Sequence, residues 1–418
     1  MDHRAVAVVG SGVAGLTAAY VLAKSNDVTL YEGDDRLGGH AHTHELPAPG
    51  GGTVSVDSGF IVHNERTYPW LLRLFRELGI ATQDAEMSMS VRCDGCGLEY
   101  AGARGPGGLF TGPASFRGRF LRLLAEVPAF HRRARRLLTD PPSYAVTLGD
   151  FLAGGGFSPY FVGHFVIPLV SSVWSCPAGT ALAYPAAHLF TFLEHHGLLS
   201  VTGSPQWKTV AGGSATYVEA VAKQVQRVRT GSPVHGISRS GRGAVVTAAG
   251  GAEEYDAVVI ATHPDQALRL LADATSDERR LLGAFRYERN PTVLHTDSSV
   301  LPRSRRARAS WNYRLPGCRA LPEAVHVSYD LGRLQRLPAG AEYLVTLNAD
   351  GRVDPGKVAA RMVYEHPVYT TESVAAQRLL PRLNTSVTAF AGAWHGWGFH
   401  EDGCRSGVAA ARALGAEW

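Results

Sequence analysis

Lysine is scarce in this chain of 418 residues. Lys24, Lys208, Lys223 and Lys357 are the only four, so arginine supplies most of the 41 basic residues that balance 37 Asp and Glu to a net charge of +4. A nearly neutral balance, without a basic run that carries interleaved aromatic residues, does not indicate a nucleic-acid-binding surface. We therefore expect no nucleic-acid partner.

Cysteine is also sparse. Five cysteines, an odd number, do not form the framework of a disulfide-rich domain. Cys93 and Cys96 make a lone CxxC, and a structural zinc site would need a second pair, or a Cys/His pair, at matching spacing. Because no such partner is evident, the sequence predicts a turn with two unpaired thiols and no metal.

Long hydrophobic runs are missing as well. The most apolar stretch, residues 160–174, is shorter than the ~20 residues of a membrane span and contains His164 and Pro168. The chain opens on an apolar strand, "AVAVVG", without the charged leader of a signal peptide. We expect a cytoplasmic location and no membrane-spanning helix.

The first 32 residues carry a strand, a glycine turn, a helix and a second strand. Gly10, Gly12 and Gly15 have the spacing GxGxxG, which permits a tight turn, close approach of a pyrophosphate and close packing of helix on strand. The helix that begins at Val13 and Ala14 would offer free N–H groups to the phosphates. Glu32 ends the second strand, where a carboxylate accepts hydrogen bonds from a ribose and disfavours NADP. This unit predicts a dinucleotide site.

The next residues resemble the flavin amine oxidase superfamily, which includes monoamine oxidases, protoporphyrinogen oxidases and phytoene desaturases. The run from Glu32 through Arg36 to "GGH" and the segment "VDSGF" carry the likeness, and "TAFAGAWHGWGFHEDGCRSG" resembles the carboxy-terminal flavin motif. The resemblance implies non-covalent FAD. It implies cofactor contacts by Gly10, Gly12, Val13, Ala14, Gly15, Glu32, Gly33, Arg36, Gly38, Gly39, His40, Gly59, Phe60, Ile61, Val234, Ala261, Thr262, Gly392, Ala393, Gly398, Phe399 and Gly403.

The sequence departs from the superfamily pattern in two places. Ala393 stands where the carboxy-terminal motif has an aspartate, so we expect Glu401 or Asp402 to replace its ribityl contact or the contact to be missing. No counterpart is evident for the lysine that many amine oxidases place near the flavin. A narrower likeness, in blocks such as "PQWKTVAGGS" and "GWGFHEDG", is to bacterial NAD/FAD-dependent oxidoreductases associated with cyclopropane-fatty-acid-synthase-like enzymes.

The predicted fold class is α/β, α+β overall. A Rossmann-type FAD-binding domain of the glutathione-reductase and amine-oxidase kind would carry an inserted substrate domain of mixed sheet and helices. We expect the FAD-binding domain in residues 1–85, 205–270 and 380–418. The substrate domain would take 86–204 and 271–379. Within it, residues 110–200 are expected to be mainly helical by their apolar periodicity, and 285–350 mainly strands by their alternation.

The resemblance predicts hydride transfer at flavin N5 on a hydrophobic, unsaturated acyl or polyene substrate, as a desaturase or dehydrogenase. A redox-neutral double-bond isomerase, a flavin amine oxidase and a flavin-bound scaffold are the alternatives. Such a substrate would be compatible with transient contact to a membrane or a carrier protein, and the oligomeric state is open. Candidate catalytic residues are His400 and Glu401, as a proton-transfer pair, with Trp174 and Tyr329; Glu401 could instead cap a helix.

Three histidines alternate in "RLGGHAHTHE". In an extended segment His40, His42 and His44 would share one face, as in a metal site. No carboxylate or cysteine is placed by sequence to complete a coordination shell. Since His40 falls in the double-glycine motif, we interpret the segment as part of the cofactor cradle.

Overall fold

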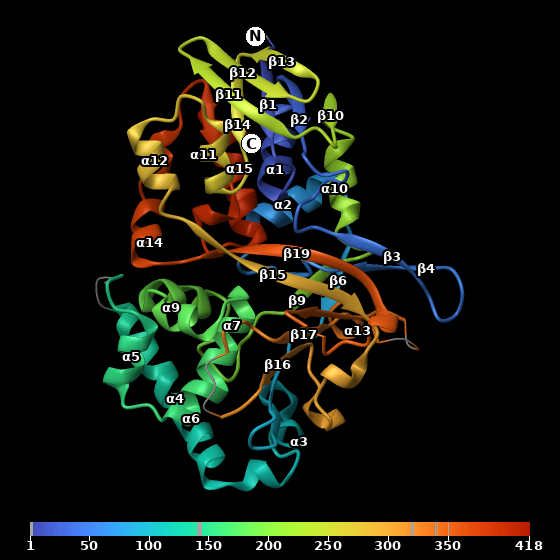
Figure 1. The fold of residues 1–418 in the computed structure, drawn as a ribbon, viewed down its shortest axis with the longest axis vertical. Helices are drawn as coiled ribbons and strands as arrows, with labels where there is room; N and C mark the ends of the chain where they lie inside the picture. Colours follow the sequence, from blue (N-terminus) through green and yellow to red (C-terminus); the bar gives the residue numbers. More distant parts are fainter. Residues whose placement is uncertain (1–2, 140–143, 319–321, 339, 341, 350) are drawn as a thin grey trace.

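The structure is a computed structural model that describes residues 3–139, 144–318, 322–338, 340, 342–349 and 351–418. Two bodies of secondary structure lie one above the other, and the long strands β15 and β19 cross between them (Figure 1). The fold is the mixed helix-and-sheet arrangement that the sequence predicts.

The upper body is built on a parallel sheet of five strands. Their order is β10 (Arg227–Arg229), β2 (Asp27–Tyr31), β1 (Ala5–Val9), β14 (Ala257–Ile260) and β20 (Thr388–Phe390). Central strands β1, β2 and β14 are apolar and almost wholly buried, as strands covered on both faces are.

Different elements cover the two faces of this sheet. Val6 and Val8 pack with the helices, whereas Ala7 and Val9 point the opposite way, toward the antiparallel sheet. The helical face carries α1 (Val13–Leu22), α2 (Pro69–Leu78), α10 (Ala215–Ala222) and α15 (His400–Ala413); the other face carries β11 (Val234–Ser240), β12 (Gly243–Ala248), β13 (Gly251–Tyr255), α11 (Pro264–Leu270) and α12 (Ser276–Leu282).

The lower body combines a seven-stranded sheet with helices (Figure 1). The strand order is β19 (Val358–Val368), β15 (Arg286–His295), β18 (Leu344–Leu347), β17 (Val327–Asp330), β16 (Trp311–Leu315), β7 (Met89–Cys93) and β8 (Leu98–Ala101). The helices are α3 (Gly105–Leu109), α4 (Gly118–Thr139), α5 (Leu148–Gly155), α6 (Pro159–Phe161), the π-turn η3 (Val162–Val166), α7 (Ile167–Trp174), α8 (Ala178–Ala183) and α9 (Ala186–His195).

Smaller elements lie between the two bodies. They are β3 (Thr43–Pro47) paired with β4 (Thr53–Asp57), the sheet of β5 (Val62–Asn64), β9 (Trp207–Val210) and β6 (Thr82–Ala85), and the helices α13 (Leu331–Leu334) and α14 (Thr371–Gln377). All strands of the five-stranded sheet fall in the segments expected to bind the cofactor, and all seven strands of the larger sheet fall in the other two. The domain boundaries themselves stay a prediction.

The CxxC turn has partners that the sequence analysis did not find. Cys93 Sγ lies 3.7 Å from Cys318 Sγ, and Cys96 Sγ lies 3.9 Å from His164 Nε2. Cys93 and Cys318 are 225 residues apart in the chain, and Cys96 and His164 are 68 residues apart. Such separations form no recognisable sequence motif, so the contacts become visible only in the fold.

Close helix packing depends on glycines in α15. A Cβ on Gly407 would lie 2.3 Å from the carbonyl oxygen of Ala14, and one on Gly403 would lie 2.5 Å from Val13 Cγ1. These two glycines let α15 lie directly on the fully buried α1.

Gly407→Val should therefore separate α15 from α1 and lower the melting temperature. Forcing a side chain into a packed interior costs about 1–3 kcal/mol of unfolding free energy. Gly154→Ala in α5 is the control, because a Cβ there meets nothing within 4 Å. Thermal denaturation followed by circular dichroism measures both variants, and equal melting temperatures would contradict this packing role.

Candidate functional site

A cavity of about 950 Å³ runs from the glycine turn of the upper body into the lower body. Its upper wall includes the turn after β1, Glu32 at the end of β2, and the segments 58–62, 261–263, 392–394 and 397–400. Its lower wall comes from β7, α4, α7 and the loop 197–204. The carboxyl ends of parallel strands are where folds of this kind bind ligands.

The glycine turn has the geometry that a pyrophosphate needs. Gly10 has a left-handed φ of +102° and its N–H donates to Tyr31 O at 2.9 Å. A Cβ on Gly15 would lie 1.9 Å from Gly10 O, so only glycine lets α1 start this close to the strand. No side chain caps α1, and Gly12, Val13 and Ala14 line the cavity. The helix terminus therefore presents its N–H groups to a ligand.

A second glycine loop closes on the first. Gly39 has a φ of +57°, and a Cβ on it would lie 3.2 Å from Gly12 Cα. The Gly38 N–H donates to Ser11 O at 3.1 Å. Glu32 also fixes this region, because its carboxylate accepts from the Ser11 N–H at 2.9 Å and from the Ser11 hydroxyl. The residues present thus fit a dinucleotide cofactor.

Most of the predicted cofactor residues line this cavity. The ones that do not are Gly15, Gly33, Arg36, Gly38, Val234 and Gly403. Their structural roles differ: Gly15, Gly38 and Gly403 permit close backbone packing, and Arg36 donates to Leu37 O at 3.4 Å within its own loop. Gly15 has the helix-packing role that the spacing predicts, and cofactor contact by the other five stays a prediction.

The three alternating histidines belong to one polar network beside the cavity. His42 Nδ1 lies 3.2 Å from the Tyr364 hydroxyl, and His44 Nε2 lies 2.8 Å from the Ser58 hydroxyl. Ser58 and Tyr364 hydrogen bond to each other at 2.6 Å. The His40 ring lines the cavity and packs 4.9 Å from the Tyr364 ring. Burial lowers the pKa of all three imidazoles.

Ser58, Tyr364 and His366 are site residues that sequence reasoning missed. All three line the cavity, and His366 packs 5.3 Å from His40. Tyr364 and His366 lie on β19, a strand beyond the segment in which the sequence predicts strands. No sequence signal marks the place where that strand meets the histidine segment.

His400 and Glu401 do not form the predicted proton-transfer pair. His400 lines the cavity, stacks on Phe60 with 3.6 Å between ring centroids, and its Nε2 lies 3.2 Å from the Tyr217 hydroxyl. Glu401 instead accepts from the N–H groups of Trp70 and Leu71, at 3.1 and 3.0 Å. It does not line the cavity: the side chain caps the start of α2, and a helix cap is the alternative that the sequence left open for it. Burial raises its pKa to about 7.

Asp402 does not replace the missing aspartate of the carboxy-terminal motif either. Its Oδ2 accepts from the N–H groups of Trp397 and Phe399, at 2.9 and 3.1 Å. Burial raises its pKa to about 6. Glu401 and Asp402 are therefore both engaged by backbone away from the cavity, and only the methyl group of Ala393 stands at the motif position.

Trp174 and Tyr329 line the cavity as predicted, but their polar atoms are already paired. Trp174 Nε1 donates to Trp397 O at 3.1 Å, and the Tyr329 hydroxyl donates to Ser172 O at 3.3 Å. These side chains offer aromatic surface and no free proton donor. Lys208 is bound by Glu65 at 3.1 Å, and the residue that reaches the cavity is its neighbour Trp207.

The parallel sheet, the paired glycine loops and the adjoining cavity define a dinucleotide-dependent enzyme. Residues 13–294 match the family model described as "Flavin containing amine oxidoreductase", and the chain belongs to this family. The description of the family names a flavin as the cofactor of its members.

Named relatives differ in what they do. The "Putative flavin-containing monoamine oxidase AofH" of Mycobacterium tuberculosis is 30% identical over 62% of this chain and 57% of its own length. The "Carotenoid phi-ring synthase" of Streptomyces griseus is 30% identical over 65% of this chain and 54% of its own length. The match thus spans little more than half of each relative. A solved "CLA-producing fatty acid isomerase from P. acnes" shares the fold at 17% identity, with a TM-score of 0.66 over 97% of both chains.

Because imidazoles are buried in this site, the unfolding free energy of the protein should depend on pH. Burial lowers the pKa of His400 to about 3, whereas in the unfolded chain it is about 6.5. Between these two pH values the unfolded chain binds one more proton at this site than the folded chain does. The unfolding free energy therefore has its full value above pH 6.5 and decreases as the pH falls below it. The loss is about 1.4 kcal/mol of unfolding free energy for each pH unit.

Between pH 6.5 and pH 4, the unfolding free energy of His400→Gln should fall less steeply with pH than that of the parent. The difference in slope should correspond to one proton. His235→Gln, at an exposed histidine of β11, should leave the slope unchanged. Urea denaturation at several pH values gives both slopes. A His400 variant with the slope of the parent would show that the imidazole titrates freely in the folded protein.

Proposed function

We propose that this protein binds FAD non-covalently and oxidises a hydrophobic, unsaturated acyl or polyene chain, as a desaturase or dehydrogenase. A bound flavin supplies the hydride acceptor at N5. The observation that carries the proposal is the composition of the cavity wall beyond the glycine loops.

That lower wall is mostly apolar. It includes Met89, Leu109, Leu123, Leu124, Val127, Phe165, Leu169, Val173 and Trp311, with His131 and several Ser and Thr hydroxyls among them. No lysine or arginine is among the described residues that line the cavity, and its carboxylates are Glu32, at the end of β2, and Glu365, on β19. Burying a charged substrate group here would be costly because no partner compensates it. A neutral chain, such as an esterified acyl group or a polyene, fits better than a charged one.

The protein's own residues would then position the substrate and keep water away from it. Trp174, Trp207 and Tyr329 supply flat apolar surfaces, and a dry cavity limits side reactions. His400 is neutral at physiological pH, since burial lowers its pKa to about 3, so it holds no proton to give as an imidazolium and is a weak base. Its ring adds to the uncharged surface of the cavity.

Support for FAD comes from Glu32. Its carboxylate reaches the cavity at the place where a ribose would lie, beyond the glycine turn. None of the five cysteines lines the cavity, which agrees with a cofactor held without a thioether bond.

Gly39→Val should abolish flavin binding, because the side chain would meet Gly12 in the closed cradle and φ of +57° strains a β-branched residue. The parent protein should be yellow and should release FAD into the supernatant on acid precipitation. Gly50→Ala, in the open loop between β3 and β4, is the control and should stay yellow. Colourless parent protein that does not take up added FAD would refute the cofactor assignment.

Two other activities compete with desaturation. A double-bond isomerase, as named for the fatty acid isomerase of the same fold, would return the hydride to the substrate. An amine oxidase, as named for AofH, would use the aromatic wall to hold an amine.

The association with cyclopropane-fatty-acid-synthase-like enzymes would place the substrate among membrane acyl chains, and contact with a membrane or a carrier protein would follow. No helix in the described part of the chain is long and apolar enough to cross a bilayer.

Anaerobic incubation separates these activities. Under the proposal, a lipid extract containing unsaturated esters or polyenes bleaches the flavin, and mass spectrometry finds a product two hydrogens lighter. A product of unchanged mass without an electron acceptor would indicate an isomerase, and bleaching by amines alone would indicate an amine oxidase; either result overturns the proposal.

Leu124→Trp should raise the KM for the substrate so identified about tenfold or more, because it fills the apolar wall. Leu121→Trp is the matched control, since this residue is 46% exposed on the same helix and does not line the cavity. Equal KM values would place the substrate elsewhere.

A further inference from the structure

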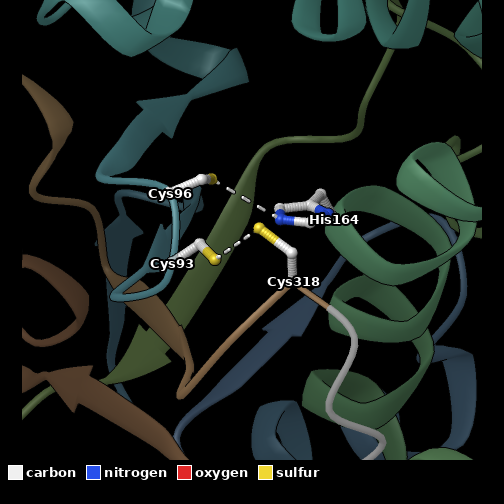
Figure 2. Close-up of side chains that lie close together, drawn as sticks. All are labelled: Cys93, Cys96, His164 and Cys318. Atoms are coloured by element: carbon white, nitrogen blue, oxygen red, sulfur yellow. Dashed lines mark hydrogen bonds between the residues drawn. The ribbon is translucent and has the colours of Figure 1, made fainter.

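Three segments that are distant in sequence bring four metal-binding side chains together in the lower body (Figure 2). Cys93 ends β7, Cys96 lies in the turn before β8, His164 lies in the π-turn η3, and Cys318 follows β16. One ligand atom from each residue lies within 4.8 Å of all the others. The cluster takes no part in the flavin cavity, since none of the four residues lines it.

Two of the separations are close to those of a tetrahedral zinc site. Zinc lies ~2.3 Å from sulfur and ~2.0–2.1 Å from nitrogen, so two sulfur ligands stand about 3.8 Å apart and a sulfur and a nitrogen about 3.6 Å apart. The Cys93 and Cys318 sulfurs are 3.7 Å apart, and Cys96 Sγ lies 3.9 Å from His164 Nε2. Since all four ligand atoms lie within 4.8 Å of one another, closure around an ion would need shifts of at most about 1 Å.

Surrounding groups orient these side chains. His164 Nδ1 lies 3.0 Å from the carbonyl oxygen of Tyr160, which fixes the proton on Nδ1 and turns the Nε2 lone pair toward the thiols. Histidine ligands of metals almost always have such a partner. A Cβ on Gly95 would lie 2.9 Å from Gly317 Cα, so this glycine lets the CxxC turn approach the segment that carries Cys318.

A hydroxyl and a guanidinium lie beside the thiols. Cys96 Sγ lies 3.5 Å from the Tyr160 hydroxyl. The thiolate is the form that binds a metal. The guanidinium of Arg119 lies 4.9 Å from the centre of the Tyr160 ring. Its charge opposes the net single negative charge that three thiolates leave around Zn²⁺.

We propose that Cys93, Cys96, Cys318 and His164 bind one structural zinc ion. Four protein ligands complete a tetrahedral shell, so the ion has no open position for a substrate. The cysteines release their protons to solvent on binding, and no redox change is involved. Three thiolates and one imidazole favour zinc over the hard cations Mg²⁺ and Ca²⁺.

The zinc ion would hold the sheet and the helices of the lower body together. β7 continues from Met89 and Val91, which line the cavity, to Cys93. On the other side, η3 leads directly into α7, which contributes Leu169, Val173 and Trp174 to the same cavity. Both walls of the apolar chamber are thus anchored at one point, so metal loss should loosen the chamber and lower stability.

Metal analysis of the flavin-loaded protein, purified without chelators or metal-affinity resin, tests the proposal. About one zinc per chain is expected, and Cys96→Ser and Cys318→Ser should each retain less than about a tenth of it. Cys176→Ser and Cys404→Ser are the controls, because these buried cysteines lie outside the cluster. Replacement of zinc by Co²⁺ should give the visible absorption of tetrahedral thiolate cobalt, absent from Cys96→Ser.

Three results would overturn the proposal. One is a Cys93–Cys318 disulfide, which intact mass measurement without reductant shows as a loss of two hydrogens. Another is a stoichiometric amount of iron in place of zinc. The third is a protein with free thiols that holds no metal and gives no cobalt spectrum after dialysis against either ion. If a cysteine variant fails to fold, His164→Gln takes its place in the test. The zinc content and the melting temperature of His164→Gln are then compared with those of the parent.

Discussion

The cofactor end of this protein depends on backbone-to-backbone contact between two glycine turns. Gly10 and Gly15 bring the start of α1 against β1, and Gly39 lies against Gly12 across the cradle. Each contact is closer than a side chain would allow. The surrounding groups, including the Glu32 carboxylate bound to Ser11 and the packing of α15 on α1, hold these turns in place. A dinucleotide can then meet main-chain N–H groups instead of long side chains.

Sequence reasoning was strongest where chemistry is local. The turn after β1, the acid at the end of β2 and the double-glycine loop could be predicted because their spacing along the chain is itself the requirement. Gly403 shows the limit of such reasoning: it belongs to a cofactor motif, yet it permits the packing of α15 on Val13. The fold class was predictable for the same reason, since an alternation of strands and helices determines which layers can form.

Contacts between distant segments could not be predicted. Glu401 follows His400 in sequence, but the helical turn directs it to the start of α2. Tyr364 and His366 join the histidine segment only because β19 passes beside it. Cys318 meets Cys93 across 225 residues. In each case tertiary packing determines the partner. The local sequence would form the same helix or strand whichever residues that element packed against.

The order of strands in the upper sheet has a consequence for synthesis of the protein. β1 and β2 are made first, but their neighbours β14 and β20 come from residues 257–260 and 388–390, and α15 covers α1 only after residue 400. Domains usually fold in order of emergence from the ribosome. In this protein, the apolar surfaces of the first strands stay partly uncovered until the last tenth of the chain has been translated. The cavity wall is therefore also completed late, because residues 392–394 and 397–400 line it.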